Sequence, residues 1–202
     1  MCLTGDGESL VDQFSTGLMG LDPDDLLTEP CVLRAGPVHR ATIGRCSCGI
    51  IGCGGVEVEI QLDLGRVLWT AVDTTLRITF ESAQYIAEVQ RAIEDRSWET
   101  PDRTAGRLIS EAVDNEALRS RGFEFCWASG RCRDGMMTSA LMLKPGPYQV
   151  LVHLPWDGED VSGIVGDFRT ILSQPPQVWP TVEWHPQEQG LGPPPVVGPA
   201  WK

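Results

Sequence analysis

Three cysteines within eight residues are the side chains of this chain best placed to do chemistry. Cys46, Cys48 and Cys53 lie in the segment RCSCGIIGCGG, which also holds four glycines. Thiols at this spacing can bind a metal ion, form a disulfide or pack beneath a sharp turn. Because zinc takes four ligands in a tetrahedron and binds thiolates readily, the segment predicts a structural zinc site with these three cysteines as ligands.

A closed zinc site needs a fourth ligand, and the sequence offers several. We take His39, from the extended stretch before the thiols, as this ligand. Other candidates are Cys31 in the same stretch, and Cys126 or Cys132 farther along the chain. An ion held in this way stabilises a small hairpin and takes no part in turnover.

Two other interpretations of the same thiols stay open. Cysteine often packs as a small apolar residue, and a glycine-rich turn leaves room beneath it for such packing. Alternatively, Cys48 and Cys53 form a redox pair, which requires their Cα atoms to come within about 7 Å of each other. The odd total of seven cysteines weighs against a disulfide framework.

The sequence shows no constellation that is typical of an enzyme. The three histidines, His39, His153 and His185, lie outside any known Cys–His signature. The glycine run at 49–55 lacks the lysine and the following helix of a phosphate-binding loop. We therefore predict no catalytic residue, and the sequence favours a protein without enzymatic activity.

Alternation of apolar and polar residues places the thiols on a β-hairpin. Residues 56–62 read VEVEIQL, the pattern of a strand with one face in water. Residues 32–46 are expected to be extended as well, so the glycine-cysteine segment forms the tip between two strands. Gly54 and Gly55 allow the positive φ that such a tip often needs.

The remaining elements predict the fold class. Helical spacing of apolar residues begins at Ser82, at Pro101 and near Asp157. Further strands are expected at 66–72, 76–80, 123–127, 137–143 and 148–154. Strands, two helices, strands and a helix in this order predict an α+β fold with a mainly antiparallel sheet, the cysteine-rich hairpin and three main helices.

Changes in composition along the chain predict three segments. Residues 1–30 form an acidic N-terminal segment, 31–173 a single α+β domain, and 174–202 a C-terminal tail rich in proline and tryptophan. The end of this tail, from 186 onward, reads as flexible, with Trp201 as its one candidate anchor.

Charge and hydropathy narrow the classes of partner. The net charge of −12 argues against nucleic acid and against an anionic membrane surface, and it favours a basic protein partner. No apolar run approaches the ~18 residues of a membrane span. The N-terminus lacks the features of a targeting segment, so we expect a cytoplasmic protein.

The segment Cys46–Cys53 with the alternating residues 56–60 resembles a segment of small uncharacterised bacterial proteins, which implies a bacterial origin and attaches no activity. Together these observations predict a non-catalytic binding protein of the bacterial cytosol. One version is an immunity-type protein that masks a toxin with its acidic surface. The alternatives are a metalloprotein with structural zinc at the CxCxxxxC site and a thiol redox enzyme.

Overall fold

A computed structural model of the chain describes residues 4–5, 8–9, 18–28, 30–72 and 75–202. Part of the acidic segment at 1–30 therefore lies outside the described residues. The chain divides into two compact units. Unit 1 comprises residues 1–49 and 53–98, and unit 2 comprises residues 50–52 and 99–202. Within the described residues, no helix is long and apolar enough to cross a membrane.

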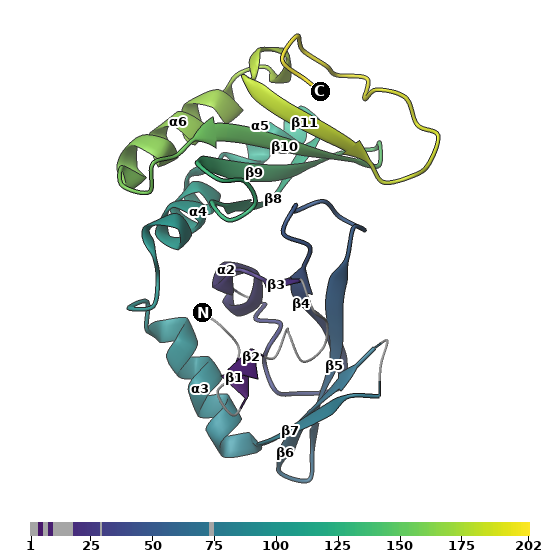
Figure 1. Ribbon diagram of the computed structural model, residues 1–202, viewed down its shortest axis with the longest axis vertical. Coiled ribbons are helices and arrows are strands. Elements are labelled where there is room, and N and C mark those ends of the chain that lie inside the picture. Colours follow the sequence, from purple (N-terminus) through teal and green to yellow (C-terminus); the bar gives the residue numbers. More distant parts are fainter. Residues whose placement is uncertain (1–3, 6–7, 10–17, 29, 73–74) are drawn as a thin grey trace. The chain divides into compact units, whose positions relative to one another are not determined.

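Unit 1 is built on a five-stranded antiparallel sheet with strand order β3-β4-β5-β6-β7 (Figure 1). Its strands are β3 (Met19–Gly20), β4 (His39–Arg45), β5 (Gly55–Asp63), β6 (Arg66–Ala71) and β7 (Arg77–Glu81). Its helices are α2 (Pro23–Leu27) and α3 (Ser82–Glu94). A separate pair, β1 (Thr4–Gly5) with β2 (Glu8–Ser9), is also antiparallel.

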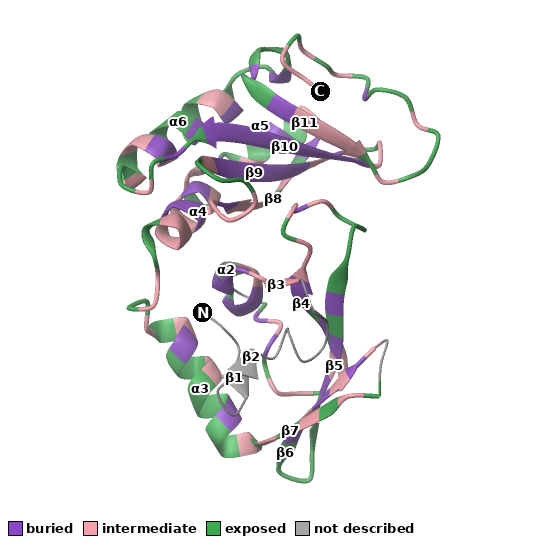
Figure 2. Cartoon of the chain, in the orientation of Figure 1, coloured by how far each residue is buried: buried purple, intermediate pink, exposed green. Residues whose placement is uncertain are grey.

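The alternation in β5 explains why this sheet has one dry and one wet face. Val56, Val58 and Ile60 are buried, whereas Glu57 and Gln61 between and beyond them are exposed, as Figure 2 shows along the strand. The buried face continues across β6 through Trp69, whose indole N–H donates to the hydroxyl of Tyr85 on α3 at 3.2 Å. The helices thus cover the apolar face of the sheet.

Unit 2 is a four-stranded antiparallel sheet with order β11-β10-β9-β8. Its strands are β8 (Phe123–Ser129), β9 (Met136–Leu143), β10 (Tyr148–Pro155) and β11 (Thr181–Pro186). Its helices are α4 (Pro101–Ala112), α5 (Asn115–Ser120), α6 (Val161–Ser173) and the short 3-10 turn η1 (Pro176–Val178).

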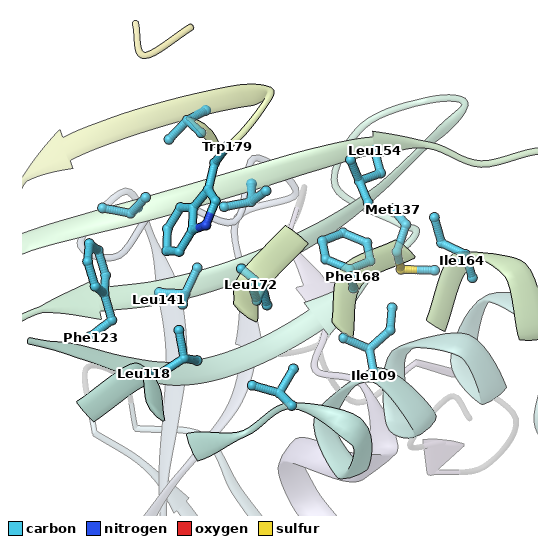
Figure 3. Close-up of a cluster of buried hydrophobic side chains, with 14 of the residues drawn as sticks. Ile109, Leu118, Phe123, Met137, Leu141, Leu154, Ile164, Phe168, Leu172 and Trp179 are labelled. Carbon is cyan, nitrogen blue, oxygen red and sulfur yellow. The ribbon is translucent and has the colours of Figure 1, made fainter. Parts of the chain in front are cut away.

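The core of unit 2 lies between its helices and one face of its sheet. Figure 3 shows Leu172 of α6 beside Leu141 of β9 and Phe168 of α6 beside Ile109 of α4, and all four are nearly inaccessible to water. Trp179 closes this core at 1 % exposure. Truncating such fully buried side chains to alanine typically costs about 2–5 kcal/mol, so this core dominates the stability of the unit.

The structure confirms the α+β class and the mainly antiparallel pairing, and α3, α4 and α6 are the three long helices. The predicted single domain over 31–173 is corrected to two units, because two separate apolar cores form on two separate sheets. The one helix expected from Pro101 is interrupted at Val113, and α5 starts after Asp114, whose side chain caps it. Local periodicity cannot reveal either division.

The segment at 174–202 is packed on unit 2 and is not a flexible tail. Residues 181–186 form β11, which pairs with β10 along its length. Near the end, Trp201 stacks on Trp179 with ring centroids 6.1 Å apart and forms a parallel bridge with Val182. The anchoring role expected for Trp201 is therefore seen in the structure, and the proline-rich stretch before it is held at both ends.

Candidate metal centre at the turn between β4 and β5

The turn between β4 and β5 brings the two ends of the cysteine segment together. The strands are antiparallel neighbours, with Arg45 opposite Gly55. Beyond this pair, the backbone N–H of Cys46 donates to the carbonyl oxygen of Gly54 at 2.9 Å. The ladder thus continues past the strands, and it places Cys46 across from Gly54, the residue next to Cys53.

Glycines let the chain reverse direction twice within this segment. The N–H of Gly49 donates to the carbonyl of Cys46 at 3.1 Å and closes a tight turn over Ser47 and Cys48. Gly49 has φ of 76° and Gly52 has φ of 81°, values that side-chain-bearing residues rarely adopt. The two turns fold the segment so that its three thiols can meet on one side.

The three sulfurs lie together. Among the described residues, Cys46, Cys48 and Cys53 are the one group of His, Cys, Asp or Glu side chains whose ligand atoms all lie within 4.8 Å of one another. The sulfur of Cys48 is 3.2 Å from that of Cys46, and none of the three thiols is in a disulfide. A tetrahedral zinc ion with zinc–sulfur bonds of about 2.3 Å sets its sulfurs about 3.8 Å apart, so small side-chain rotations suffice to bind it.

Cys46 and Cys53 have shifted pKa values, and the two shifts are in opposite directions. Hydrogen bonds from the backbone N–H of Cys48, and then from the thiols of Cys48 and Cys53, lower the pKa of Cys46. The hydrogen bond to Cys46, the bond to Cys48 and repulsion by both sulfurs raise the pKa of Cys53 to about 11. These hydrogen bonds favour the thiolate form, which is the form that binds a metal ion, at Cys46 over Cys53.

Exposure differs across the group. Cys46 and Cys48 are half-buried, and Cys53 is exposed. The group is therefore accessible to solvent on the side of Cys53.

An ion pair holds the base of the turn. Arg45, the last residue of β4, donates through Nη2 to a carboxylate oxygen of Asp22 at 3.4 Å, and the side chains are only 12 % and 11 % exposed. Asp22 lies just before α2, so the pair ties the start of the turn to this helix. Sequence reasoning missed this contact, because nothing local links two residues so far apart in the chain.

The structure does not bring His39 to the thiols. His39 is the first residue of β4 and Cys46 follows its last, so at about 3.3 Å per residue they lie roughly 20 Å apart along the strand. The two ring nitrogens of His39 lie 3.0 Å from the carbonyl of Pro37 and 2.9 Å from that of Val32. The imidazole thus contacts the backbone of the loop before β4. His39 is therefore not the fourth ligand that the sequence predicted.

The other three candidates for the fourth ligand also lie outside the thiol group. Cys31 is buried in the core of unit 1, where its thiol donates to the carbonyl of Leu26 at 3.3 Å. Cys126 and Cys132 belong to unit 2. Within the described part of the chain, none of these three joins the group of close ligand atoms, so the turn supplies three ligands.

The sequence predicted the three thiols as a group, and their convergence at the turn follows from the hairpin that positions them. Comparison of the chain with protein-family models, with curated proteins and with solved structures finds no match.

Proposed function

We propose that this protein binds a zinc ion at the turn between β4 and β5 through Cys46, Cys48 and Cys53, and that the ion fixes the turn. The observation that carries the proposal is the convergence of three sulfur atoms within 4.8 Å of one another. Thiolates are soft ligands that select zinc or monovalent copper over calcium and magnesium, and zinc is the common structural ion at such a turn.

Three protein ligands leave one position of a tetrahedral ion for a group from outside the turn. Because Cys53 is exposed, this position faces solvent and is accessible to a water molecule or to a side chain of a binding partner. This arrangement supports the predicted role of a non-catalytic binding protein, in which the metal-bound turn is part of the surface that a partner contacts.

The immunity-type role, with an acidic surface for a basic partner, is part of the same proposal. The net charge of −12 supports it through long-range attraction of a basic protein. Capture experiments with the zinc-loaded chain in a native lysate test it at low and moderate salt. Recovery of no protein partner under either condition would count against the binding role and leave the zinc site intact.

A thiol redox function is the second candidate, and one feature of the turn favours it. Cys46 has a lowered pKa, and the sulfur of Cys48 lies 3.2 Å away, so these two thiols can form a disulfide when peroxide accepts two electrons and two protons from them. Mild peroxide treatment followed by mass analysis tests this. If all thiols stay reduced, the redox function is excluded.

Metal analysis tests the leading proposal. The chain is expressed and purified without added metal, and zinc is measured by elemental analysis. We expect about one equivalent less zinc in Cys48→Ser than in the native chain and in Cys126→Ser, because Cys126 belongs to the other unit and is no part of the turn. Equal zinc contents in the native chain and Cys48→Ser, or less than half an equivalent in the native chain with no uptake on zinc titration, would end the proposal.

A further inference from the structure

A second group of metal-ligating side chains lies on the sheet of unit 2. His153 is on β10, and Glu183 and His185 are two residues apart on β11, so the pair on β11 shares one face of the sheet. The register places Leu151 opposite Glu183, and His153 stands two residues from Leu151 on the same face. All three side chains therefore project from the face opposite to the one that carries Val152 and the helix-covered core.

Both imidazoles point an unused nitrogen toward the same carboxylate. The Nε2 atom of His153 lies 3.8 Å, and that of His185 4.0 Å, from Oε2 of Glu183. Both Nε2 atoms are buried from water and have no hydrogen-bond partner. Because buried polar atoms in proteins almost always have partners, two orphaned nitrogens beside one oxygen indicate that a further group binds between them.

In His153 and Glu183, the polar atom that does not face the group already contacts another side chain. Nδ1 of His153 lies 2.9 Å from the hydroxyl of Thr138 on β9. When Nδ1 carries the hydrogen, Thr138 accepts it and Nε2 keeps its lone pair for a ligand. Oε1 of Glu183 accepts from Nη1 of Arg133 at 2.8 Å, which leaves Oε2 facing the imidazoles. Such outer contacts are typical of histidine and carboxylate ligands in metal sites.

An ion pair between His153 and Glu183 explains the group less well. Burial, with the positive charge of Arg133 and the neighbouring His185, lowers the pKa of His153 more than Glu183 raises it. Burial thus favours the neutral form of the ring, which is the form in which histidine binds metals. A neutral ring at 3.8 Å neither pairs with the carboxylate nor hydrogen-bonds to it.

We propose that His153, Glu183 and His185 form a binding site for a divalent transition-metal ion, of which zinc fits best, separate from the thiol turn. A tetrahedral zinc ion sets nitrogen and oxygen ligands about 3.4 Å apart, roughly 0.5 Å closer than the two distances to Glu183. The two imidazoles stand farther apart than this, since the three residues do not form a close group of ligand atoms. His185 closes this gap by rotating, because its side chain is 27 % exposed.

Two imidazoles and one carboxylate give the ion three protein ligands and an open fourth position. This pattern is typical of zinc sites that bind water or a substrate, whereas structural sites are closed by four protein ligands. The two sites of the chain therefore differ in ligand chemistry, with sulfur in unit 1 and nitrogen with oxygen in unit 2.

The experiment removes the thiol site and titrates what remains. In the full chain carrying Cys46→Ser, Cys48→Ser and Cys53→Ser, Co²⁺ and Zn²⁺ binding are measured by calorimetry and by visible absorption. We expect one equivalent of Co²⁺ with a spectrum that lacks thiolate charge-transfer bands. Adding His185→Gln or Glu183→Gln weakens binding at least tenfold, whereas His39→Gln, the matched control in unit 1, leaves it unchanged.

Nuclear magnetic resonance of the three imidazoles gives an independent readout. On addition of Zn²⁺, the ring signals of His153 and His185 shift together and that of His39 does not. If the triple serine variant does not fold, the native chain is first loaded with one equivalent of Zn²⁺ and the second equivalent is followed. The proposal is overturned if the His39→Gln and His185→Gln variants bind the metal with equal affinity. It is also overturned if the ring signals of His153 and His185 do not shift when Zn²⁺ is added. Neither result bears on the thiol site.

Discussion

Unit 1 and unit 2 are both antiparallel sheets covered by helices, but they differ in how much of the sheet is dry. Along β5 of unit 1, buried residues alternate with exposed ones, whereas every residue of β10 from Tyr148 to Leu154 is buried. Each unit contains a fully buried tryptophan, Trp69 in unit 1 and Trp179 in unit 2. The difference lies in the central strands, because β10 is covered on both faces and β5 on one.

The candidate sites follow the same division. In unit 1 the ligands lie on a turn, where an ion would fix a backbone that few other contacts hold. In unit 2 the ligands lie on strands: β10 lies between β11 and β9, and β11 pairs with β10 on one side and contacts residues 200–202 on the other. An ion at either site stabilises its own unit by binding the folded state, but only in unit 1 is it expected to fix the backbone of a turn. The following predictions test this comparison, from the largest expected effect to the smallest.

Truncation of the core of unit 2 has the largest effect. Trp179→Ala removes an indole that contacts Phe123 and stacks on Trp201, and we expect a loss of about 3–5 kcal/mol in the free energy of unfolding. Val178→Ala, at a neighbouring site that is 59 % exposed, serves as the control and changes stability little. Chemical denaturation measures both. Equal losses for the two variants would contradict the account of this core.

Zinc stabilises unit 1 in a thiol-dependent manner. At a free zinc concentration a hundred times the dissociation constant, binding to the folded state adds about 2.7 kcal/mol. Hydrogen exchange should show this protection in β4 and β5 of the native chain and not in Cys48→Ser. Protection of β4 and β5 that persists without Cys48 would contradict the role of the thiol turn.

Loss of the ion pair at the base of the turn has an intermediate effect. Asp22→Asn keeps the shape of the side chain and removes the charge that faces Arg45, and we expect a loss of about 1.5–3 kcal/mol because both side chains are largely buried. Asp63→Asn, at an exposed residue of β5, is the control. Zinc affinity should fall with Asp22→Asn, since the turn is then less well fixed. An unchanged affinity would show that the pair serves α2 alone.

The cap of α3 gives the smallest effect and a dependence on pH. Glu81 accepts the backbone N–H groups of Gln84 and Ala83, which lower its pKa below the ordinary value. The carboxylate therefore stabilises the folded state at neutral pH, and this contribution is lost as the pH falls through the lowered pKa. Glu81→Gln should weaken the acid dependence of thermal unfolding, and Glu57→Gln, also exposed, should not. Identical pH profiles would exclude the cap as a cause.

The sequence predicted what local patterns encode. The alternation at 56–62 and the helical spacing after Ser82 and Pro101 are local, so β5, α3 and α4 lie where they were expected. The hairpin placed Cys46 and Cys53 together for the same reason. The predictions that were wrong concern which residues, distant in the sequence, meet in space. His39 was expected to reach the thiols although a straight strand separates them.

Two further features could not be read from local pattern. The division into two units depends on which apolar faces meet, and no change in composition marks residue 98. The group of His153, Glu183 and His185 depends on β11, which prolines on either side of residues 181–185 concealed. The spacing of Glu183 and His185 by two residues was the one signal available, and it became informative only once a strand was known to form there.

The last residues of the chain have a consequence for how this protein behaves at high concentration. Val182 and Trp184 of β11 exchange backbone hydrogen bonds with Ala200 and Lys202, on the side of the strand away from β10. An outer strand with unpaired amides is a template on which another molecule can add its own strand. Here the backbone groups of β11 are paired with residues 200–202 of the same chain. Removal of these residues should leave the groups unpaired and make the protein more prone to aggregate.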